Sequence, residues 1–296
     1  MRWVGGDGDP ACGVWVLGRD PGEVEERVGK PFQGPAGDLL NKVLAAAGWH
    51  RSQVYVDNVV GVRPPNNKWE AHAEADIERG IAAYRERLEL HRPRLVIALG
   101  NEALRTACGV DPRDGKALPG IQDARGYLWD SPLGGRVIGA SHPAGILREW
   151  VPWRALLELD LKKAAKEFRA GCPPLPNRAV TVLTEPHEVA AFRGAIKDAP
   201  LLSLDIENTA ERTLSCLGVA ASTDHAFVIP ATHDWQLALI REGCESKVPK
   251  VFQNGMYDRY FLRARCGIEV RNHTFDTILA WHCLQPELAG KALDKR

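Results

Sequence analysis

The 296-residue sequence predicts two α/β domains in tandem, the first with a mostly parallel sheet and the second with a mixed one. Three observations support this. Short apolar runs alternate with helical patterns in the first half, a proline-rich break interrupts the chain at 171–178, and closely spaced strand patterns follow it. The length favours two domains, and an apolar content of 45% suffices for two cores.

The first domain, expected at residues 1–170, contains four apolar runs with the length of buried strands. Helical patterns lie between them. Short buried strands separated by helices are typical of a parallel sheet covered on both faces, so a three-layer α/β/α domain is predicted. The expected strands are 12–17, 53–60, 94–100 and 135–141, and the expected helices are 36–47, 73–91, 101–108 and 152–169.

The segment 171–178 contains three prolines and is expected to be a semi-rigid linker. The second domain, expected at 179–296, begins with a strand at 179–183 and a helix at 184–197. Strand patterns then follow one another so closely that they predict antiparallel pairing. These lie at 201–207, 214–222 and 225–230, and a helix, a strand at 249–254 and two more helices complete the chain.

Charge and cysteine usage narrow the class of protein. Lys and Arg together number 38, as do Asp and Glu, so no overall basic excess indicates nucleic acid, although a local groove could still bind it. The start of the chain has no apolar leader, and no 18-residue apolar run occurs, so a soluble cytoplasmic protein without membrane contact is expected. Seven scattered cysteines without a C-x-x-C pair favour reduced thiols.

Carboxylates in the second domain have a spacing that suits a metal. Asp205 and Glu207 are two residues apart on a strand, so they leave the same face. Asn254 and Asp258 are four apart near the start of a helix. Carboxylate oxygens from two elements suit Mg²⁺ or Mn²⁺, which can activate water for phosphodiester cleavage. The alternative to a metal site is that Asp205 and Glu207 merely lie at a solvent-exposed end of a strand.

The order LDIE, hairpin, N-x-x-x-D and FDTILAWHCLQPE resembles the proofreading 3′–5′ exonuclease domain of family A DNA polymerases, an RNase H-like fold, from residue 179 onward. The resemblance implies metal ligation by Asp205, Glu207 and Asp258. It also implies that Asn254 positions the DNA strand and that Asp276 is a structural helix cap. The family's downstream Tyr-x-x-x-Asp motif is missing, which implies an incomplete exonuclease in an N-terminal fragment or a natural truncation.

Four ordered motifs in the first domain are GRDPG…GKPFQGPAGDLL, VDNVVGVRPPNN, LVIALGNEAL and SHPAGILR. Together they resemble uracil-DNA glycosylases, most closely the family 4 type, over residues 12–165. Such a domain is known fused ahead of exonuclease and polymerase domains in phage-type DNA polymerases. The resemblance therefore implies DNA as the partner, a polymerase region following in the full-length protein, and a bacterial or phage-infected cell.

The glycosylase resemblance implies a pocket for a uracil flipped out of the duplex. Asp20 would activate water, and His142 would hydrogen-bond the uracil O2 as negative charge develops. Phe32 would stack on the base, and Asn58 would read its O4 and N3–H edge. Gly18 and Arg19 are also expected at the bound nucleotide. The expected DNA contacts are Gly34, Gly37, Arg63, Ser141, Leu147 and Arg148.

Two positions depart from the family 4 pattern. Where Gly-Glu-Ala-Pro-Gly is usual, this sequence has Arg19 in place of the glutamate and an acid one residue later, Asp20, as in the family 1 pattern. The cysteine of K-C-R-P-P is Val62, and only Cys12 remains near the N-terminus. Since family 4 holds an iron–sulfur cluster with four cysteines, no cluster is expected here, and packing around Val62 and nearby tryptophans would replace it.

Two other functions fit the sequence. The first domain could be a catalytically inactive DNA-binding or uracil-sensing module of a polymerase, with Arg19 as a phosphate contact. The chain could also join a phosphate-handling α/β domain to an RNase H-like domain of unrelated chemistry.

Overall fold

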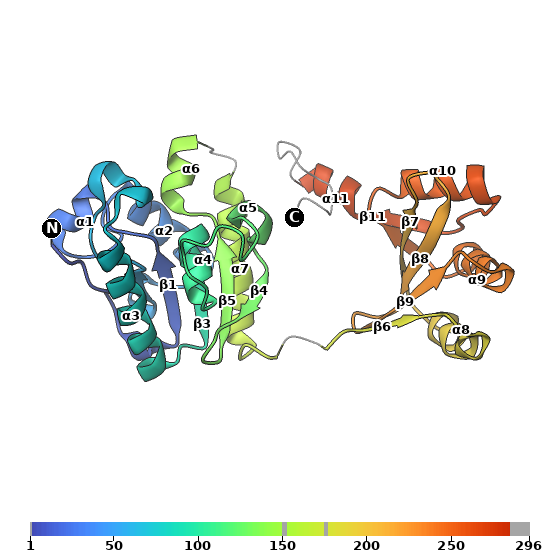
Figure 1. The fold of residues 1–296 in the computed structure, drawn as a ribbon, viewed down its shortest axis with the longest axis horizontal. Helices are drawn as coiled ribbons and strands as arrows, with labels where there is room; N and C mark the ends of the chain where they lie inside the picture. Colours follow the sequence, from blue (N-terminus) through green and yellow to red (C-terminus); the bar gives the residue numbers. More distant parts are fainter. Residues whose placement is uncertain (1, 150–152, 175–176, 285–296) are drawn as a thin grey trace. The chain divides into compact units, whose positions relative to one another are not determined.

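A computed structural model describes residues 2–149, 153–174 and 177–284. The chain divides into two compact units, one ending at Pro174 and the other beginning at Leu175, which are described separately (Figure 1). Each unit has an α/β architecture with its own sheet, so the predicted fold class is confirmed. Among the described helices, none is both long and apolar enough to cross a membrane.

The first unit has a five-stranded sheet in the order β2-β1-β3-β5-β4. All its pairings are parallel except that of β4 with β5 at one edge. All four predicted strands are present, with shifted ends, whereas β4 was not predicted from the sequence. The strands are β1 (Val14–Gly18), β2 (Tyr55–Asn58), β3 (Leu95–Leu99), β4 (Leu128–Asp130) and β5 (Arg136–Ala140).

Helices cover both faces of this sheet (Figure 1). The four predicted helices correspond to α2, α3, α4 and α7, and three shorter ones were not predicted. The helices are α1 (Glu23–Val28), α2 (Pro35–Ala46), α3 (Glu74–His91), α4 (Asn101–Ala107), α5 (Ile121–Ala124), α6 (Pro143–Glu149) and α7 (Trp153–Arg169). Short 3₁₀ turns are η1 (Pro10–Cys12), η2 (Arg51–Gln53), η3 (Pro65–Asn67) and η4 (Trp69–Ala71).

Alternate residues of each strand belong to different cores. On β1, Val14 and Val16 pack with α2 and α7, while Trp15 and Leu17 pack with α3 and α4. This follows because successive side chains of a strand point to opposite faces, so a sheet covered on both sides requires apolar residues at every position. The helices cover the faces of the sheet but not its carboxyl edge. The loops that follow β1, β2, β3 and β5 at this edge form the site.

The second unit has a six-stranded sheet in the order β11-β10-β7-β8-β9-β6. The strands β7, β8 and β9 form the predicted antiparallel meander, and β10 and β11 continue the sheet parallel to β7. This is the RNase H-like arrangement expected from the sequence. The strands are β6 (Ala179–Val182), β7 (Leu202–Asn208), β8 (Leu214–Ala220), β9 (His225–Pro230), β10 (Lys250–Phe252) and β11 (His273–Asp276).

Four helices and a 3₁₀ turn are described beside this sheet. Of its strands, β11 was not predicted from the sequence. On β7, Leu202, Leu204 and Ile206 are buried in the core, while Asp205 and Glu207 are exposed on the other face. The alternation matches the strand period of two residues. The helical elements are η5 (Pro186–Glu188), α8 (Val189–Lys197), α9 (Asp234–Glu245), α10 (Gly255–Cys266) and α11 (Thr277–Leu284).

Candidate active site

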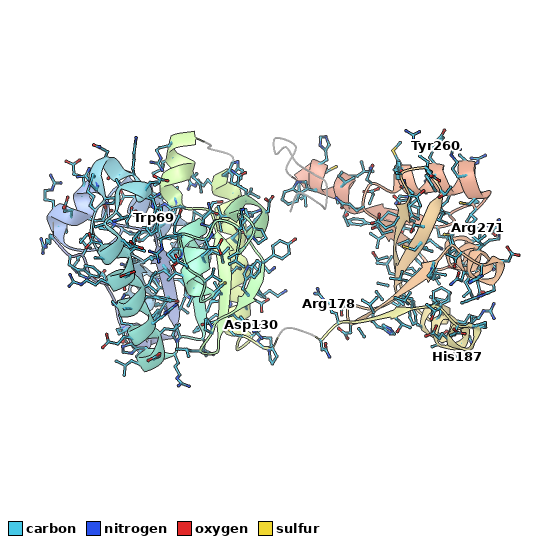
Figure 2. All side chains as sticks on the ribbon, in the orientation of Figure 1. Trp69, Asp130, Arg178, His187, Tyr260 and Arg271 are labelled. Carbon is cyan, nitrogen blue, oxygen red and sulfur yellow. The ribbon has the colours of Figure 1, made fainter. Side chains whose placement is uncertain are left out.

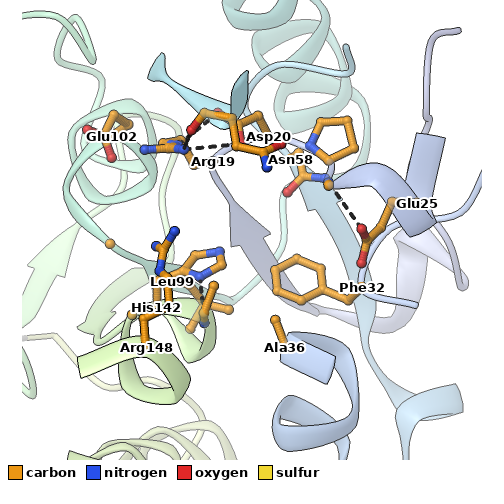
Figure 3. A pocket seen from close by; sticks show the side chains of 16 residues that line it. Arg19, Asp20, Glu25, Phe32, Ala36, Asn58, Leu99, Glu102, His142 and Arg148 are labelled. Carbon is orange, nitrogen blue, oxygen red and sulfur yellow. Dashed lines mark hydrogen bonds and ion pairs between the residues drawn. The ribbon is translucent and has the colours of Figure 1, made fainter. Parts of the chain in front are cut away.

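Loops from the carboxyl ends of β1, β2, β3 and β5 enclose a pocket of about 270 Å³ in the first unit (Figure 3). Ligands in open α/β sheets bind at this edge, next to the point where the strand order reverses. The volume lies just below the range of about 300–1,000 Å³ found for small-molecule sites, which suits one small ring. Six residues predicted for the site line it, namely Arg19, Asp20, Phe32, Asn58, His142 and Arg148.

Two glycines make room for Phe32, one beside its backbone and one beside its ring. Phe32 has a positive φ of 54°, and a Cβ on Gly37 would collide with its carbonyl oxygen. A Cβ on Gly18 would lie 2.5 Å from Asn58 Oδ1 and 2.6 Å from Phe32 Cζ. The missing side chain of Gly18 therefore lets the Asn58 amide and the Phe32 ring lie close together, and its contact with a bound nucleotide stays a prediction.

Asn58, the last residue of β2, presents an unused acceptor to the pocket. Its Oδ1 is buried and has no hydrogen-bond partner, which is uncommon for a buried polar atom. Its backbone N–H donates to Asp57 Oδ1 at 2.8 Å. Asp57 in turn pairs with Arg87 at 2.8 Å and accepts from the Tyr55 hydroxyl at 3.0 Å. Buried groups thus hold the backbone of Asn58 while its side chain stays available.

His142, just beyond β5, is neutral and has one defined tautomer. Its Nδ1 accepts a hydrogen bond of 3.1 Å from the backbone N–H of Ala144, so Nε2 carries the hydrogen. Burial, together with the nearby Arg19 charge, lowers the pKa of His142 to about 4. The imidazole is nearly parallel to the Phe32 ring, with centroids 5.7 Å apart. A neutral N–H donor therefore lies beside an aromatic face.

Asp20 and Arg19 form an ion pair at the wall of the pocket. Arg19 Nε donates to Asp20 Oδ2 at 2.8 Å, and Arg19 Nη2 donates to the backbone oxygen of Asn67 at 3.3 Å. The Asp20 side chain is only 9% exposed. The residue that replaces the usual glutamate thus neutralises the neighbouring carboxylate.

Glu25 is a site residue that the sequence analysis missed. Its buried carboxylate accepts backbone N–H groups of Gly22, Gln33 and Gly34 at 3.1, 3.0 and 2.9 Å. It thereby ties the turn after β1 to the loop that carries Phe32. Its position three residues into the helix that begins after Gly22 is a capping signal that could have identified it.

Several predicted DNA contacts have partners within the protein instead. The Gly34 N–H is taken by Glu25, and Gly37 is buried against Phe32. Arg63 donates to Asn67 Oδ1 at 2.8 Å and lies 3.6 Å from two glutamates of α1. Ser141 is buried, and its Oγ has no hydrogen-bond partner. The Gly34 N–H and the Arg63 guanidinium thus have partners within the protein, whereas the Ser141 hydroxyl is buried without one, and all four stay predictions as DNA contacts.

Two other predicted DNA contacts lie on α6 and are accessible. Leu147 is 53% exposed, and Arg148 is exposed at the edge of the pocket (Figure 3). Both side chains are therefore accessible to a ligand at the pocket, and their contact with DNA stays a prediction. Asn67, the last residue of η3, and Glu102, in the first turn of α4, also line the pocket and were not predicted as site residues.

The position of the iron–sulfur cysteine is packed with apolar groups. Val62 is 6% exposed in a core that the rings of Trp3 and Trp69 also contact. Cys12 Sγ is 3.1 Å from the backbone oxygen of Val14. Across the described residues, no three His, Cys, Asp or Glu side chains are placed to hold a metal ion. Since the Val62 side chain has no atom that can bind iron, the residues at this position do not fit a cluster.

In the second unit the predicted metal ligands do not form a single ligand set. Asp205 and Glu207 are exposed on β7, whereas Asp258 is buried and accepts a hydrogen bond of 3.2 Å from the Ile206 backbone. Among the described residues of this unit, no three His, Cys, Asp or Glu side chains lie close enough together to hold a metal ion. Burial raises the pKa of Asp258 to about 6, with Asp205 adding to the shift. In this arrangement the three carboxylates do not provide a common ligand set, and their assignment as metal ligands stays a prediction.

Two further residues near these carboxylates have clear structural roles. Asn254 has a left-handed backbone with φ 60° and lies before α10, so it does not share a helix face with Asp258 as predicted. Asp276 accepts the backbone N–H groups of Asn254, Gly255 and Ile278 at 3.1, 2.7 and 2.9 Å. The prediction that Asp276 is a helix cap is confirmed.

Comparison with known proteins defines the class. A family model described as the uracil DNA glycosylase superfamily matches residues 6–169, and the chain belongs to this superfamily. It is 33% identical over 153 residues to a type-4 uracil-DNA glycosylase of Pyrobaculum aerophilum, covering 49% of this chain and 74% of that protein. It is 36% identical over 166 residues to the type-4 enzyme of Thermotoga maritima, covering 56% and 82%.

Solved exonuclease structures give weaker likenesses. The EXD2 exonuclease domain soaked in Mg and GMP has a TM-score of 0.29 and 18% identity, covering 38% of this chain and 64% of that one. Escherichia coli RNase D, an exoribonuclease involved in structured RNA processing, has a TM-score of 0.31 and 22% identity, covering 40% and 32%. The chain thus spans less than two thirds of either structure.

Proposed function

We propose that the first unit is a uracil-DNA glycosylase, which hydrolyses the bond between uracil and the sugar of a nucleotide flipped out of DNA. The observation that carries the proposal is the buried, unpartnered Oδ1 of Asn58 in the same pocket as Phe32, His142 and Asp20. Membership of the superfamily and the similarity to type-4 enzymes support it.

Asn58 selects the base by hydrogen-bond polarity. Its Oδ1 accepts the N3–H of uracil and its amide donates to O4, whereas cytosine offers an acceptor and a donor at these two positions. A buried polar group without a partner costs about 1–3 kcal/mol, so two mismatched positions strongly disfavour cytosine. Phe32 supplies the apolar face against which the base stacks.

His142 stabilises the leaving group. When the bond between the sugar and uracil breaks, the electron pair passes to the base, and negative charge develops at O2. Neutral His142 donates from Nε2, the nitrogen that its contact with Ala144 leaves protonated. A preorganised donor of this kind is worth about 3–4 kcal/mol, because it needs no reorganisation during the reaction.

Asp20 directs the water. The carboxylate accepts a proton from the water that attacks the sugar carbon, in the manner of a general base. The product is an abasic site in the DNA and free uracil. Leu147 and Arg148 contact the DNA beside the pocket, and binding weakens as salt rises. The polymerase region implied by the resemblance and the cytoplasmic location expected from the sequence remain predictions.

Uracil release from single- and double-stranded oligonucleotides tests the proposal. We expect release by the wild-type chain and a loss of about a hundredfold or more in Asp20→Asn and Asn58→Ala. Asn41→Ala, an exposed change on α2, is the matched control and retains the wild-type rate. A silent wild type would refute hydrolysis, and DNA binding without base release would favour the inactive module.

A further inference from the structure

The Asp20 carboxylate is held from two sides. Arg19 Nε donates to Asp20 Oδ2 at 2.8 Å, and His72 Nε2 lies 3.3 Å from the same oxygen. Because a carboxylate oxygen accepts, the His72 nitrogen is the donor. The His72 side chain is 1% exposed, so the contact is shielded from solvent. His72 lies far from Asp20 in the sequence and does not line the pocket.

The segment between β2 and α3 brings His72 to this place. The His72 ring packs edge-on against Trp69, with centroids 5.1 Å apart at 74°, and its backbone N–H donates to the Trp69 oxygen at 3.1 Å. Trp69 is labelled in Figure 2, on the first unit. The same segment supplies the Asn67 carbonyl that binds Arg19. One loop therefore fixes both partners of Asp20.

The two donors leave one carboxylate oxygen with capacity to spare. Both short contacts fall on Oδ2, while Oδ1 has only a long contact of 3.4 Å to Arg19 Nη2. Each carboxylate oxygen can accept about two hydrogen bonds, so Oδ2 is filled and Oδ1 can bind water. Without His72, Arg19 alone would hold Asp20, and the carboxylate could rotate to shorten its 3.4 Å contact between Oδ1 and Arg19 Nη2, which would occupy Oδ1.

We propose that His72 is a positioning residue, which fixes the Asp20 carboxylate so that Oδ1 directs the attacking water. The inference rests on the proposed glycosylase function. In the step concerned, water oxygen bonds to C1′ of the deoxyuridine, the C1′–N1 bond breaks with its electron pair leaving on uracil, and the water proton passes to Oδ1. His72 makes no contact with the substrate and acts through Asp20.

A double-mutant cycle in the full chain tests this. The variants are His72→Ala, His72→Gln, Asp20→Asn and the pair His72→Ala with Asp20→Asn. Single-turnover uracil release and affinity for the uracil-containing oligonucleotide are measured for each, together with the melting temperature. His50→Ala, an exposed histidine outside the pocket, is the control.

We expect His72→Ala to slow release by about ten- to a hundredfold while affinity stays unchanged, because misplacement of a catalytic group by about 1 Å has an effect of this size. His72→Gln keeps a donor N–H and should recover most of the rate. In the Asp20→Asn background, His72→Ala should cause no further loss.

Two results would overturn the inference: wild-type release rates in His72→Ala, or losses that simply multiply in the double variant. A ring-nitrogen NMR spectrum provides a readout besides activity, since Asp20→Asn should shift the His72 resonance if the contact exists. A wild type that releases no uracil would instead refute the proposed function itself. The two failures are thus distinguishable.

Discussion

The Phe32 ring and the His142 imidazole lie 5.7 Å apart between centroids and 28° from parallel, although they come from loops after different strands. The first is apolar, and the second carries an N–H donor at Nε2. A small planar ring that entered the pocket could therefore stack on Phe32 and accept a hydrogen bond from His142 Nε2.

Gly18→Ala should abolish excision without unfolding the protein. The new Cβ would lie 2.5 Å from Asn58 Oδ1 and 2.6 Å from Phe32 Cζ, so both groups would have to move. A displacement of about 1 Å costs about a hundredfold in rate. The measurement is single-turnover uracil release with a thermal melt alongside. Gly120→Ala, where nothing lies within 4 Å of the added Cβ, should behave as wild type.

The stability of the first unit should fall as pH drops from 6.5 toward 4, partly because of His142. Its pKa falls from 6.5 to about 4 in the folded state, so the unfolded chain takes up a proton in this range and the native state does not. The contribution of His142 to stability is therefore fully present above pH 6.5 and is lost as the pH falls toward 4. Melting temperatures at pH 7 and 4.5 should differ less in His142→Gln than in the wild type. An equal difference would contradict the assignment.

Asp276→Ala should destabilise the second unit by about 1–3 kcal/mol, since it leaves several backbone N–H groups at the starts of α10 and α11 without their acceptor. Urea denaturation and hydrogen exchange of the α10 amides would measure the loss. Asp198→Ala changes an exposed aspartate after α8 and should have little effect. Unaltered exchange in α10 would refute the capping role.

Nuclease activity of this chain should be weak or absent. The carboxylates of Asp205, Glu207 and Asp258 do not form a three-residue metal group within the described residues. Degradation of a labelled single strand with Mg²⁺ or Mn²⁺ is the assay. Robust cleavage that Asp205→Ala abolishes would contradict the prediction, and a Glu211→Ala variant, which alters an exposed loop carboxylate, controls for charge loss.

The sequence predicted the parts of the fold that local patterns determine. Buried strands such as β3 read as continuous apolar runs, so their positions were clear. The strand β4 was missed because its residues are only partly buried and depend on pairing with β5. At the site, Asp20, Phe32, Asn58 and His142 were identified through motifs and do line one pocket.

What the sequence could not supply were contacts between distant loops. His72 reaches Asp20 only because the segment after β2 folds back through two 3₁₀ turns, with left-handed conformations at Asn66 and Asn67. Likewise, the expected pairing of Asn254 with Asp258 assumed a helix that began earlier than α10 does. In both cases the backbone path, rather than residue type, decides which side chains meet.

The Glu25 carboxylate, which binds three backbone N–H groups of two loops, has a consequence for how a nucleotide enters. The loops that form the walls of the pocket are already joined to each other when the chain folds, so a guest base does not have to organise them. The entropy of ordering these loops is lost during folding rather than during association, and more of the contact energy therefore remains for holding the extruded nucleotide.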